Sequence, residues 1–583
     1  MDYYLCDNAE CGYITEAPEP ERCPLCGGEF FTRMDEDELA GEEWTALAEQ
    51  AEERGDADTA VRCFTRGAEL EFAPAQCGLA WCYEAGYGVE QSWEEAARRY
   101  AIAADQGYAP AQCSYGWCLE QGRGVRADPE KAFYWYSCSA EQQYPRGLCE
   151  LGLCYEMGRG VDQDWEKAAI LYRAAAERDS TQGQCNLAWC YEHGDGVEQD
   201  RAQALRWYGE AARRGDPRGQ SMVGLYYETG LETEQSWENA VRWYQAAARQ
   251  DYAPALCNLA WCLCRGKGIP QDQAKAAKLY ARAANQGSIR GLYELGQCYE
   301  MGWGVEKNQK RAVQLYRLSA EAGHPLAQFN LAWCYDRGVG VEQDHSEAVL
   351  WYMRAAQKGD ARAQYNLAWD YEHGEGVEKD QKLAVDWYQK AADQGYAAAQ
   401  CNLGRCYRDG EGVDQDYAQA IRWYRRSAEQ KFPRGLFSLG WCYDNGLGVE
   451  KDPAEAARWY SKAADGGDVQ AQYNLAWDYA RGEGVTQSWP HAVALYRKAA
   501  DQGHADALYS LAQCVEHGLG VESDLDEAAR LYAQAADKGV QRAREDWKRL
   551  TGMRSIPHRI KRLVHKLFSG RRDYEGRTDP EKN

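Results

Sequence analysis

Four cysteines near the start of the chain have the spacing best suited to metal chemistry. Cys6 and Cys11 stand in LCDNAECGYI, and Cys23 and Cys26 stand in RCPLCGG. Two close pairs of thiolates can surround one ion as a tetrahedral set of four sulfur ligands. Glycine directly follows Cys11 and Cys26, which lets the backbone turn so that its amides face the sulfurs. The spacing predicts a structural zinc site, with iron or no metal as the weaker alternatives.

Residues 1–33 resemble a zinc ribbon or a rubredoxin-like knuckle. The pair Cys23 and Cys26, with Pro24 between them, is typical of such a knuckle, whereas the four-residue gap after Cys6 is longer than usual. Four protein ligands leave no open position for a substrate, so we expect a structural role rather than a catalytic one. A module of this size has little core, and it would need the metal in order to fold.

Glycine-rich stretches such as YEHGEGVEKD, at residues 371–380, are a second candidate for chemistry. A Gly-x-Gly loop can hold a phosphate when a strand precedes it, and no strand pattern precedes this one. The stretch also recurs at steps of 36 residues from Gly86 to Gly518, which is unlike a single ligand loop. The nine histidines form no Ser-His-Asp or Cys-His arrangement. The sequence therefore predicts neither an enzyme nor a small-molecule substrate.

The 36-residue period indicates the elements that position any site. Tyrosine recurs in 13 units from Tyr100 to Tyr532, with alanine four residues before and after it. Residues four apart lie on one face of a helix. The first half of each unit, such as AQYNLAWDYEHG, predicts another helix. Gly374 suits its left-handed C-cap, and Asp380 suits the N-cap of the helix that follows. Each unit is therefore predicted to be a pair of helices joined by a glycine turn.

Stacked helix pairs bury the faces that a single pair leaves exposed. We therefore predict an all-α fold, a right-handed α/α superhelical solenoid of about 13 repeats with degenerate caps and the small N-terminal ribbon. Residues 34–70 are expected to be a linker and a degenerate first helical pair, and residues 71–550 the solenoid with a closing half-repeat. Residues 551–570 predict a basic amphipathic helix, and residues 571–583 a disordered tail.

The fifth unit departs from the pattern at its turn. Glu232 and Thr233 replace the second glycine and the valine of the other units. A side chain at that position is strained if the backbone keeps a positive φ. We therefore predict that the turn at 230–234 differs from its twelve counterparts.

The repeat pattern A-x-x-x-L-[AG]-x-x-Y-E-x-G-x-G-V-x-x-D-x-x-x-A-x-x-x-Y-x-x-A-A resembles the Sel1-like repeat family, a relative of the tetratricopeptide repeats. The resemblance covers roughly residues 70–540. It implies an adaptor or scaffold that binds other proteins, and it names no partner. A hydrolase activity attributed to some relatives is a less favoured implication.

By analogy with tetratricopeptide repeats, the first helix of each unit lines a concave groove. This analogy directs two columns of residues toward the groove, together with that of Cys77. The tryptophan column comprises the residues equivalent to Trp81, which are Trp in eight units: Trp81, Trp117, Trp189, Trp261, Trp333, Trp369, Trp441 and Trp477. The acidic column comprises the acidic residues equivalent to Glu84, in ten units: Glu84, Glu120, Glu156, Glu192, Glu228, Glu300, Asp336, Glu372, Asp444 and Glu516.

Tryptophan faces beside carboxylates favour arginine and lysine side chains. The predicted partner is therefore a basic protein or peptide. The residues expected to bind it are Trp189, Glu192, Trp261, Trp333, Asp336, Trp369, Glu372, Trp441 and Asp444. The alternative is that the tryptophans pack against the next unit and the carboxylates are only solvated.

The segment RSIPHRIKRLVHKLFSG joins an apolar stripe to a basic face that carries Arg559, Lys561, Arg562 and Lys566. Such a helix can lie on an anionic membrane surface or dock on a partner protein. It can also cap the last repeat. A membrane-surface adaptor is therefore an alternative function.

The charge of the chain is unevenly distributed. The net charge is −24, yet residues 541–583 carry 13 Lys/Arg against 6 Asp/Glu, which leaves −31 on the rest. An acidic body argues against nucleic-acid binding. The start of the chain has no signal-peptide pattern, and no apolar run is long enough for a membrane span. We therefore expect a cytoplasmic protein whose 23 cysteines are metal ligands or reduced thiols.

Overall fold

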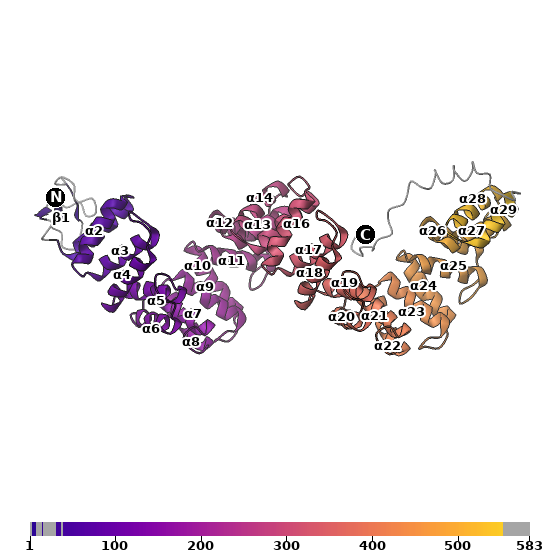
Figure 1. Ribbon diagram of the computed structural model, residues 1–583, viewed down its shortest axis with the longest axis horizontal. Coiled ribbons are helices and arrows are strands. Elements are labelled where there is room, and N and C mark those ends of the chain that lie inside the picture. Colours follow the sequence, from indigo (N-terminus) through magenta and orange to yellow (C-terminus); the bar gives the residue numbers. More distant parts are fainter. Residues whose placement is uncertain (1–2, 7–13, 16–21, 23–30, 36–38, 552–583) are drawn as a thin grey trace. The chain divides into compact units, whose positions relative to one another are not determined.

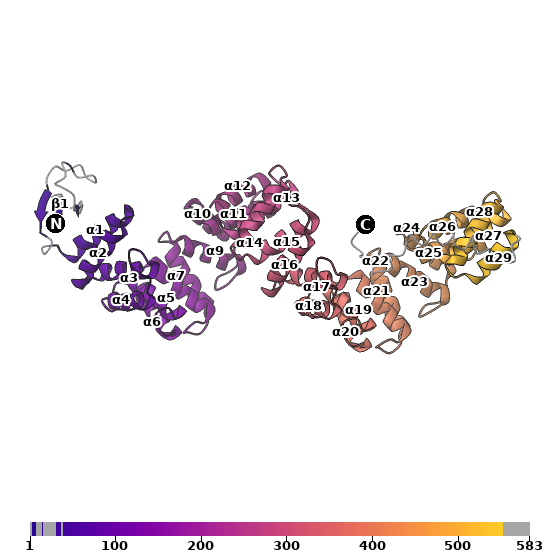
Figure 2. The same ribbon diagram turned by 45° about the horizontal axis from the view of Figure 1, so that its top comes forward.

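The computed structural model describes residues 3–6, 14–15, 22, 31–35 and 39–551. These residues form 29 helices and three short strands. The chain divides into two compact units, Met1–Lys307 and Asn308–Asn583. Within each unit the helices follow one another in chain order as antiparallel pairs (Figures 1 and 2). The predicted all-α solenoid of 36-residue helix pairs is confirmed.

The unit Met1–Lys307 contains a small sheet and fifteen helices among its described residues. They are β1 (Tyr3–Cys6), β2 (Ile14–Thr15), β3 (Phe31–Met34), α1 (Gly41–Glu53), α2 (Ala57–Glu69), α3 (Ala73–Ala85), α4 (Trp93–Asp105), α5 (Ala109–Gln121), α6 (Pro129–Glu141), α7 (Pro145–Met157), α8 (Trp165–Ala176), α9 (Thr181–His193), α10 (Arg201–Arg213), α11 (Pro217–Thr229), α12 (Trp237–Arg249), α13 (Ala253–Arg265), α14 (Gln273–Asn285) and α15 (Ile289–Met301).

The unit Asn308–Asn583 contains fourteen helices among its described residues. They are α16 (Gln309–Glu321), α17 (Pro325–Arg337), α18 (His345–Gln357), α19 (Ala361–His373), α20 (Gln381–Asp393), α21 (Ala397–Asp409), α22 (Tyr417–Glu429), α23 (Pro433–Asn445), α24 (Pro453–Asp465), α25 (Val469–Arg481), α26 (Trp489–Asp501), α27 (Ala505–His517), α28 (Leu525–Asp537) and α29 (Gln541–Thr551). From α3 to α28, odd-numbered helices are the first helices of the repeats and even-numbered helices are the second.

The glycine turn joins the two helices of a repeat as the sequence predicts. Gly374 ends α19 in the left-handed conformation, with φ of 76°. The Asp380 carboxylate accepts hydrogen bonds from two backbone N–H groups at the start of α20, each at 3.0 Å. Gly376 has φ of 70°, and a Cβ built on it would lie 2.2 Å from the carbonyl oxygen of His345. At Gly376 glycine is therefore favoured both by the backbone conformation and by the close approach to the preceding repeat.

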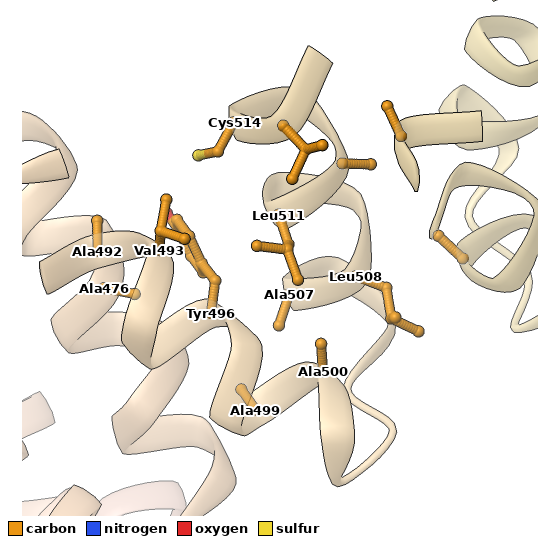
Figure 3. Close-up of a cluster of buried hydrophobic side chains, with 14 of the residues drawn as sticks. Ala476, Ala492, Val493, Tyr496, Ala499, Ala500, Ala507, Leu508, Leu511 and Cys514 are labelled. Carbon is orange, nitrogen blue, oxygen red and sulfur yellow. The ribbon is translucent and has the colours of Figure 1, made fainter. Parts of the chain in front are cut away.

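The core contains one tyrosine from the second helix of each repeat, with alanines four residues before and after it. All 13 tyrosines of the column from Tyr100 to Tyr532 are buried, and none is more than 3% exposed. Figure 3 shows one segment of this core, where Tyr496 and Ala499 of α26 face Ala507 and Leu511 of α27. Alanine lets neighbouring helices approach closely, and the tyrosine ring fills the space between them.

The turn of the fifth repeat keeps the conformation of its counterparts, so the prediction of a changed turn is wrong. Glu232 has φ of 53°, close to the 66° to 73° of the glycines at the equivalent positions. Gly230 still ends α11 in the left-handed conformation. Glu232 therefore adopts a backbone conformation that side chains disfavour.

The N-terminal sheet has the order β2-β1-β3, and both pairings are antiparallel. Cys6 is the last residue of β1 and pairs with Phe31 of β3. Cys11, Cys23 and Cys26 lie outside the described residues, as do Arg559, Lys561, Arg562 and Lys566. Among the described residues, no helix combines the length and the apolar character that crossing a membrane requires.

Candidate functional site: an acidic, tryptophan-lined surface on the first helices

A cavity of about 390 Å³ opens on the surface made by the first helices of the unit Met1–Lys307. Most of its lining comes from α1, α3, α5 and α7, and α2 and α4 add Phe64 and Tyr100. Trp81 and Trp117 of the tryptophan column line it, as do Cys77 and Glu84. The structure therefore brings together residues from all three columns that the sequence directs toward a groove.

The cavity is acidic. Glu49, Glu52 and Glu84 line it, against a single cation, Arg146. Burial and the nearby Glu49 carboxylate raise the pKa of Glu52 above its usual value. Burial also raises the pKa of the Cys77 thiol to about 12, so this cysteine is a neutral thiol at physiological pH. The cavity thus favours a cation and offers no activated thiol.

The carboxylates of the acidic column are held by the tyrosine core. In at least eight repeats the tyrosine hydroxyl donates a hydrogen bond to the acidic residue 16 positions earlier, at Oε2 of a glutamate or Oδ2 of an aspartate. This bond fixes the carboxylate and leaves its other oxygen for a second partner. The pairs are Tyr100–Glu84, Tyr136–Glu120, Tyr172–Glu156, Tyr208–Glu192, Tyr244–Glu228, Tyr388–Glu372, Tyr460–Asp444 and Tyr532–Glu516, at 2.5 to 3.4 Å.

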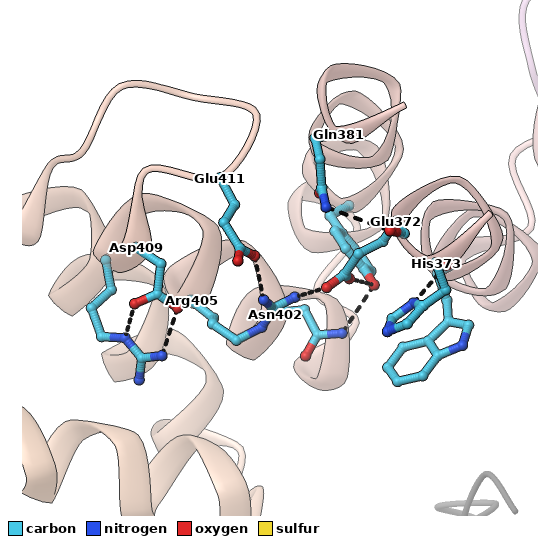
Figure 4. Close-up of polar contacts among 10 residues, drawn as sticks. Glu372, His373, Gln381, Asn402, Arg405, Asp409 and Glu411 are labelled. Atoms are coloured by element: carbon cyan, nitrogen blue, oxygen red, sulfur yellow. Dashed lines mark hydrogen bonds and ion pairs between the residues drawn. The ribbon is translucent and has the colours of Figure 1, made fainter. Parts of the chain in front are cut away.

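Three carboxylates of the acidic column carry an arginine on that second oxygen. Arg159 contacts Oε1 of Glu120 at 2.5 Å. Arg549 contacts Oε1 of Glu516 at 2.8 Å and also donates to its Oε2 at 3.0 Å. Arg405 donates to Oε1 of Glu372, and its other terminal nitrogen lies 2.6 Å from Oε2 of Glu411. Figure 4 shows Arg405 between these two carboxylates. The neighbouring carboxylates raise the pKa of Arg405 despite its partial burial, so its guanidinium stays charged.

The tryptophans predicted to bind a partner are half-buried or exposed, and several stack on side chains of the same chain. The rings of Trp189 and Trp369 lie 3.9 Å from those of His193 and His373. Trp261 stacks on Trp237, and the Arg408 guanidinium lies 5.1 Å from the centre of the Trp441 ring. Trp333 is half-buried. Trp189 remains 40% exposed, which leaves ring surface for a partner.

The predicted acidic residues differ in how much they face solvent. Glu192 and Asp444 are half-buried beside Tyr208 and Tyr460. Glu372 is buried and holds Arg405. Asp336 is also buried, and Nδ1 of His345 lies 3.1 Å from its Oδ1. Glu192 lies in the first unit with Trp189 and Trp261, and the other predicted groove residues lie in the second unit.

The sequence interpretation missed two sets of polar residues on these helices. The tyrosine–carboxylate pairs were one, although the constant spacing of 16 residues could have indicated them. The other is a buried glutamine in the first turn of eight first helices, whose amide donates to a carbonyl at the end of the preceding second helix. These are Gln76, Gln112, Gln184, Gln220, Gln328, Gln364, Gln400 and Gln472.

A family model described as Sel1 repeat matches 13 consecutive segments that together span residues 73–540. The chain belongs to the Sel1 repeat family. Proteins of this family are generally scaffolds for protein interactions.

The chain is also similar to solved structures. A protective antigen present in uropathogenic Escherichia coli strains, displaying an SLR fold, is 31% identical, with a TM-score of 0.54. That match covers 81% of this Sel1 repeat chain and 93% of the antigen. A Sel1 repeat protein from Oxalobacter formigenes is 29% identical over 55% of this chain and 95% of its own, with a TM-score of 0.45. No curated protein matches the chain.

Proposed function

We propose that this protein is a non-enzymatic scaffold that binds a basic segment of a partner protein on the first helices of the unit Met1–Lys307. The observation that carries the proposal is the cavity between α1, α3, α5 and α7, which combines tryptophan faces with three carboxylates. Trp81, in its lining, is 42% exposed, an unusual exposure for so large an apolar side chain.

The chemistry of the surface supports a cationic partner. A cation on this surface gains Coulomb attraction from Glu49, Glu52 and Glu84 and cation–π attraction from the indole rings. Residues 1–540 carry a net charge of −31, which favours association with a basic segment of a partner. The proposed compartment is the cytoplasm, because the 19 cysteines from Cys63 to Cys514 are free thiols.

The test is a titration of the full chain with three labelled peptides of equal length, one basic, one neutral and one acidic. We expect the basic peptide to bind, and Trp81→Ala to weaken it by about 2 kcal/mol, roughly thirtyfold. Glu94→Gln is the matched control, because Glu94 is exposed in the first turn of a second helix, away from the cavity. Equal binding of all three peptides, or an unchanged affinity in Trp81→Ala, contradicts the proposal.

A further inference from the structure

The internal arginines show which ligand the acidic column accepts. At Glu120, Glu372 and Glu516 the tyrosine hydroxyl lies on the oxygen numbered 2, and an arginine of the next repeat or half-repeat contacts Oε1. At Glu120 and Glu372 the tyrosine and the arginine thus use different oxygens, whereas at Glu516 the arginine contacts both. A guanidinium group is a native occupant of the space beside this carboxylate.

Two of these arginines stand where other repeats have tryptophan. Arg405 and Arg549 each lie a whole number of 36-residue repeats after Trp81, so they occupy the equivalent position in their own repeats. Each crosses from its own first helix to the carboxylate of the preceding one. The same position thus carries either an arginine that fills the space or a tryptophan that borders it.

Three repeats of the first unit have the carboxylate and the tryptophan without an arginine. Glu84, Glu156 and Glu228 each accept a hydrogen bond from their tyrosine on Oε2. The next first helix presents Trp117, Trp189 and Trp261, respectively. Among the described residues, no arginine or lysine pairs with these three carboxylates. Their Oε1 atoms are therefore the positions that an external cation can take.

We propose that Glu84, Glu156 and Glu228, each beside the tryptophan of the next repeat, bind arginine side chains of a partner peptide. The inference rests on the proposed function and specifies its ligand. The guanidinium donates to Oε1 of the glutamate and lies against the indole, as Arg405 and Arg549 donate to Glu372 and Glu516. The Glu84 position is the best enclosed of the three, because it lines the cavity that Trp81 and Trp117 also border.

Arginine fits this arrangement better than lysine. Arg405 uses two terminal nitrogens to bridge Glu372 and Glu411. A planar guanidinium has several N–H donors in fixed directions and stacks on aromatic rings, whereas an ammonium group is a compact, strongly hydrated charge. In the cavity, Glu49 and Glu52 stand with Glu84, so a bridging donor again meets more than one carboxylate.

The test uses the full chain and two labelled peptides that alternate a cationic residue with Gly-Ser, one with arginines and one with lysines. We expect the arginine peptide to bind roughly tenfold more tightly than the lysine peptide, because arginine can make a bidentate contact with a carboxylate and lysine cannot. Trp117→Arg should fill the Glu84 position from within, as Arg405 fills the Glu372 position, and remove one binding equivalent. The triple variant Trp117→Arg, Trp189→Arg, Trp261→Arg should lose arginine-peptide binding altogether.

Two further variants keep the test independent of folding. Arg405→Trp should create a site at Glu372 and add one binding equivalent, an outcome that misfolding cannot produce. Glu84→Gln retains an acceptor for Tyr100 but removes the charge, so it should weaken binding while the circular dichroism and melting temperature remain those of the parent. Glu94→Gln should bind as the parent does.

The outcomes separate this inference from the proposed function. Equal binding of both peptides, with loss in the triple variant, overturns the arginine preference and leaves the basic-peptide surface in place. Arginine-peptide binding that survives the triple variant places the ligand elsewhere and overturns the inference. If neither peptide binds the parent chain, the proposed function fails together with the inference.

Discussion

The carboxylates of the acidic column differ in whether an arginine of the adjacent repeat contacts them. Glu84 keeps one oxygen available, whereas Glu372 is covered by Arg405. The sequence predicted an acidic column with tryptophans because both residue types recur at a fixed spacing. It did not predict the arginines, because those contacts depend on how adjacent helices are rotated against each other.

Ionisation of Asp478 should lower the free energy of unfolding of the unit Asn308–Asn583. Burial, followed by the charges of Asp444 and Glu483, raises its pKa to about 7. An ordinary aspartate in the unfolded chain has a pKa of about 3.9. The folded state therefore binds the proton more tightly. The stabilisation from this group is complete below about pH 4 and is lost as the pH rises through 7.

We predict that Asp478→Asn removes this dependence. The variant and the parent should have similar melting temperatures near pH 5, and the variant should be the more stable at pH 8. Thermal unfolding followed by circular dichroism between pH 5 and pH 8 measures the difference. A difference that stays constant over this range would show that Asp478 does not titrate there.

The helices and turns were the most predictable level of the structure. Gly374 and Asp380 act as the C-cap and N-cap that their sequence positions indicated, because capping is decided within a few residues. The backbone conformation of Glu232 is an exception that its residue type did not indicate. Its residue type disfavours a positive φ, yet the turn keeps the φ of its glycine counterparts.

The glycine turn offers a matched pair of substitutions. Gly376 and Gly395 both have positive φ, at 70° and 87°. A Cβ at Gly376 would meet backbone of the preceding repeat, whereas a Cβ at Gly395 would meet nothing within 4 Å. Gly395→Ala should cost about 1 kcal/mol for its backbone conformation alone, and Gly376→Ala should cost more, about 3 kcal/mol. Urea unfolding measures both, and equal costs would contradict the close approach.

Over the whole molecule, the sequence predicts architecture better than it predicts function. A strict 36-residue period fixes the helix pairs of both units, and it does so without any information on partners. The N-terminal cysteines lie outside the repeats, so the 36-residue period does not bear on them. The backbone of Cys6 ends β1, and the other three cysteines lie outside the described residues, so the metal site remains a prediction from spacing.

We predict that the full chain, purified without chelators, carries one equivalent of zinc. The double variant Cys23→Ser, Cys26→Ser should lose it, because two of four thiolate ligands are removed. Cys138→Ser, at a half-buried cysteine in α6, is the control and should retain the metal. Elemental analysis of the three proteins decides the matter, and a metal-free parent chain would refute the predicted site.

The central claim is that partners bind the surface of the first helices in the unit Met1–Lys307. Hydrogen–deuterium exchange of the full chain, with and without the arginine peptide, tests it most directly. We predict slower exchange in α1, α3, α5 and α7, where most cavity residues lie, and unchanged exchange in α6 and α8, which contribute none. Slower exchange confined to the second helices, or no change anywhere in the presence of saturating peptide, would contradict the claim.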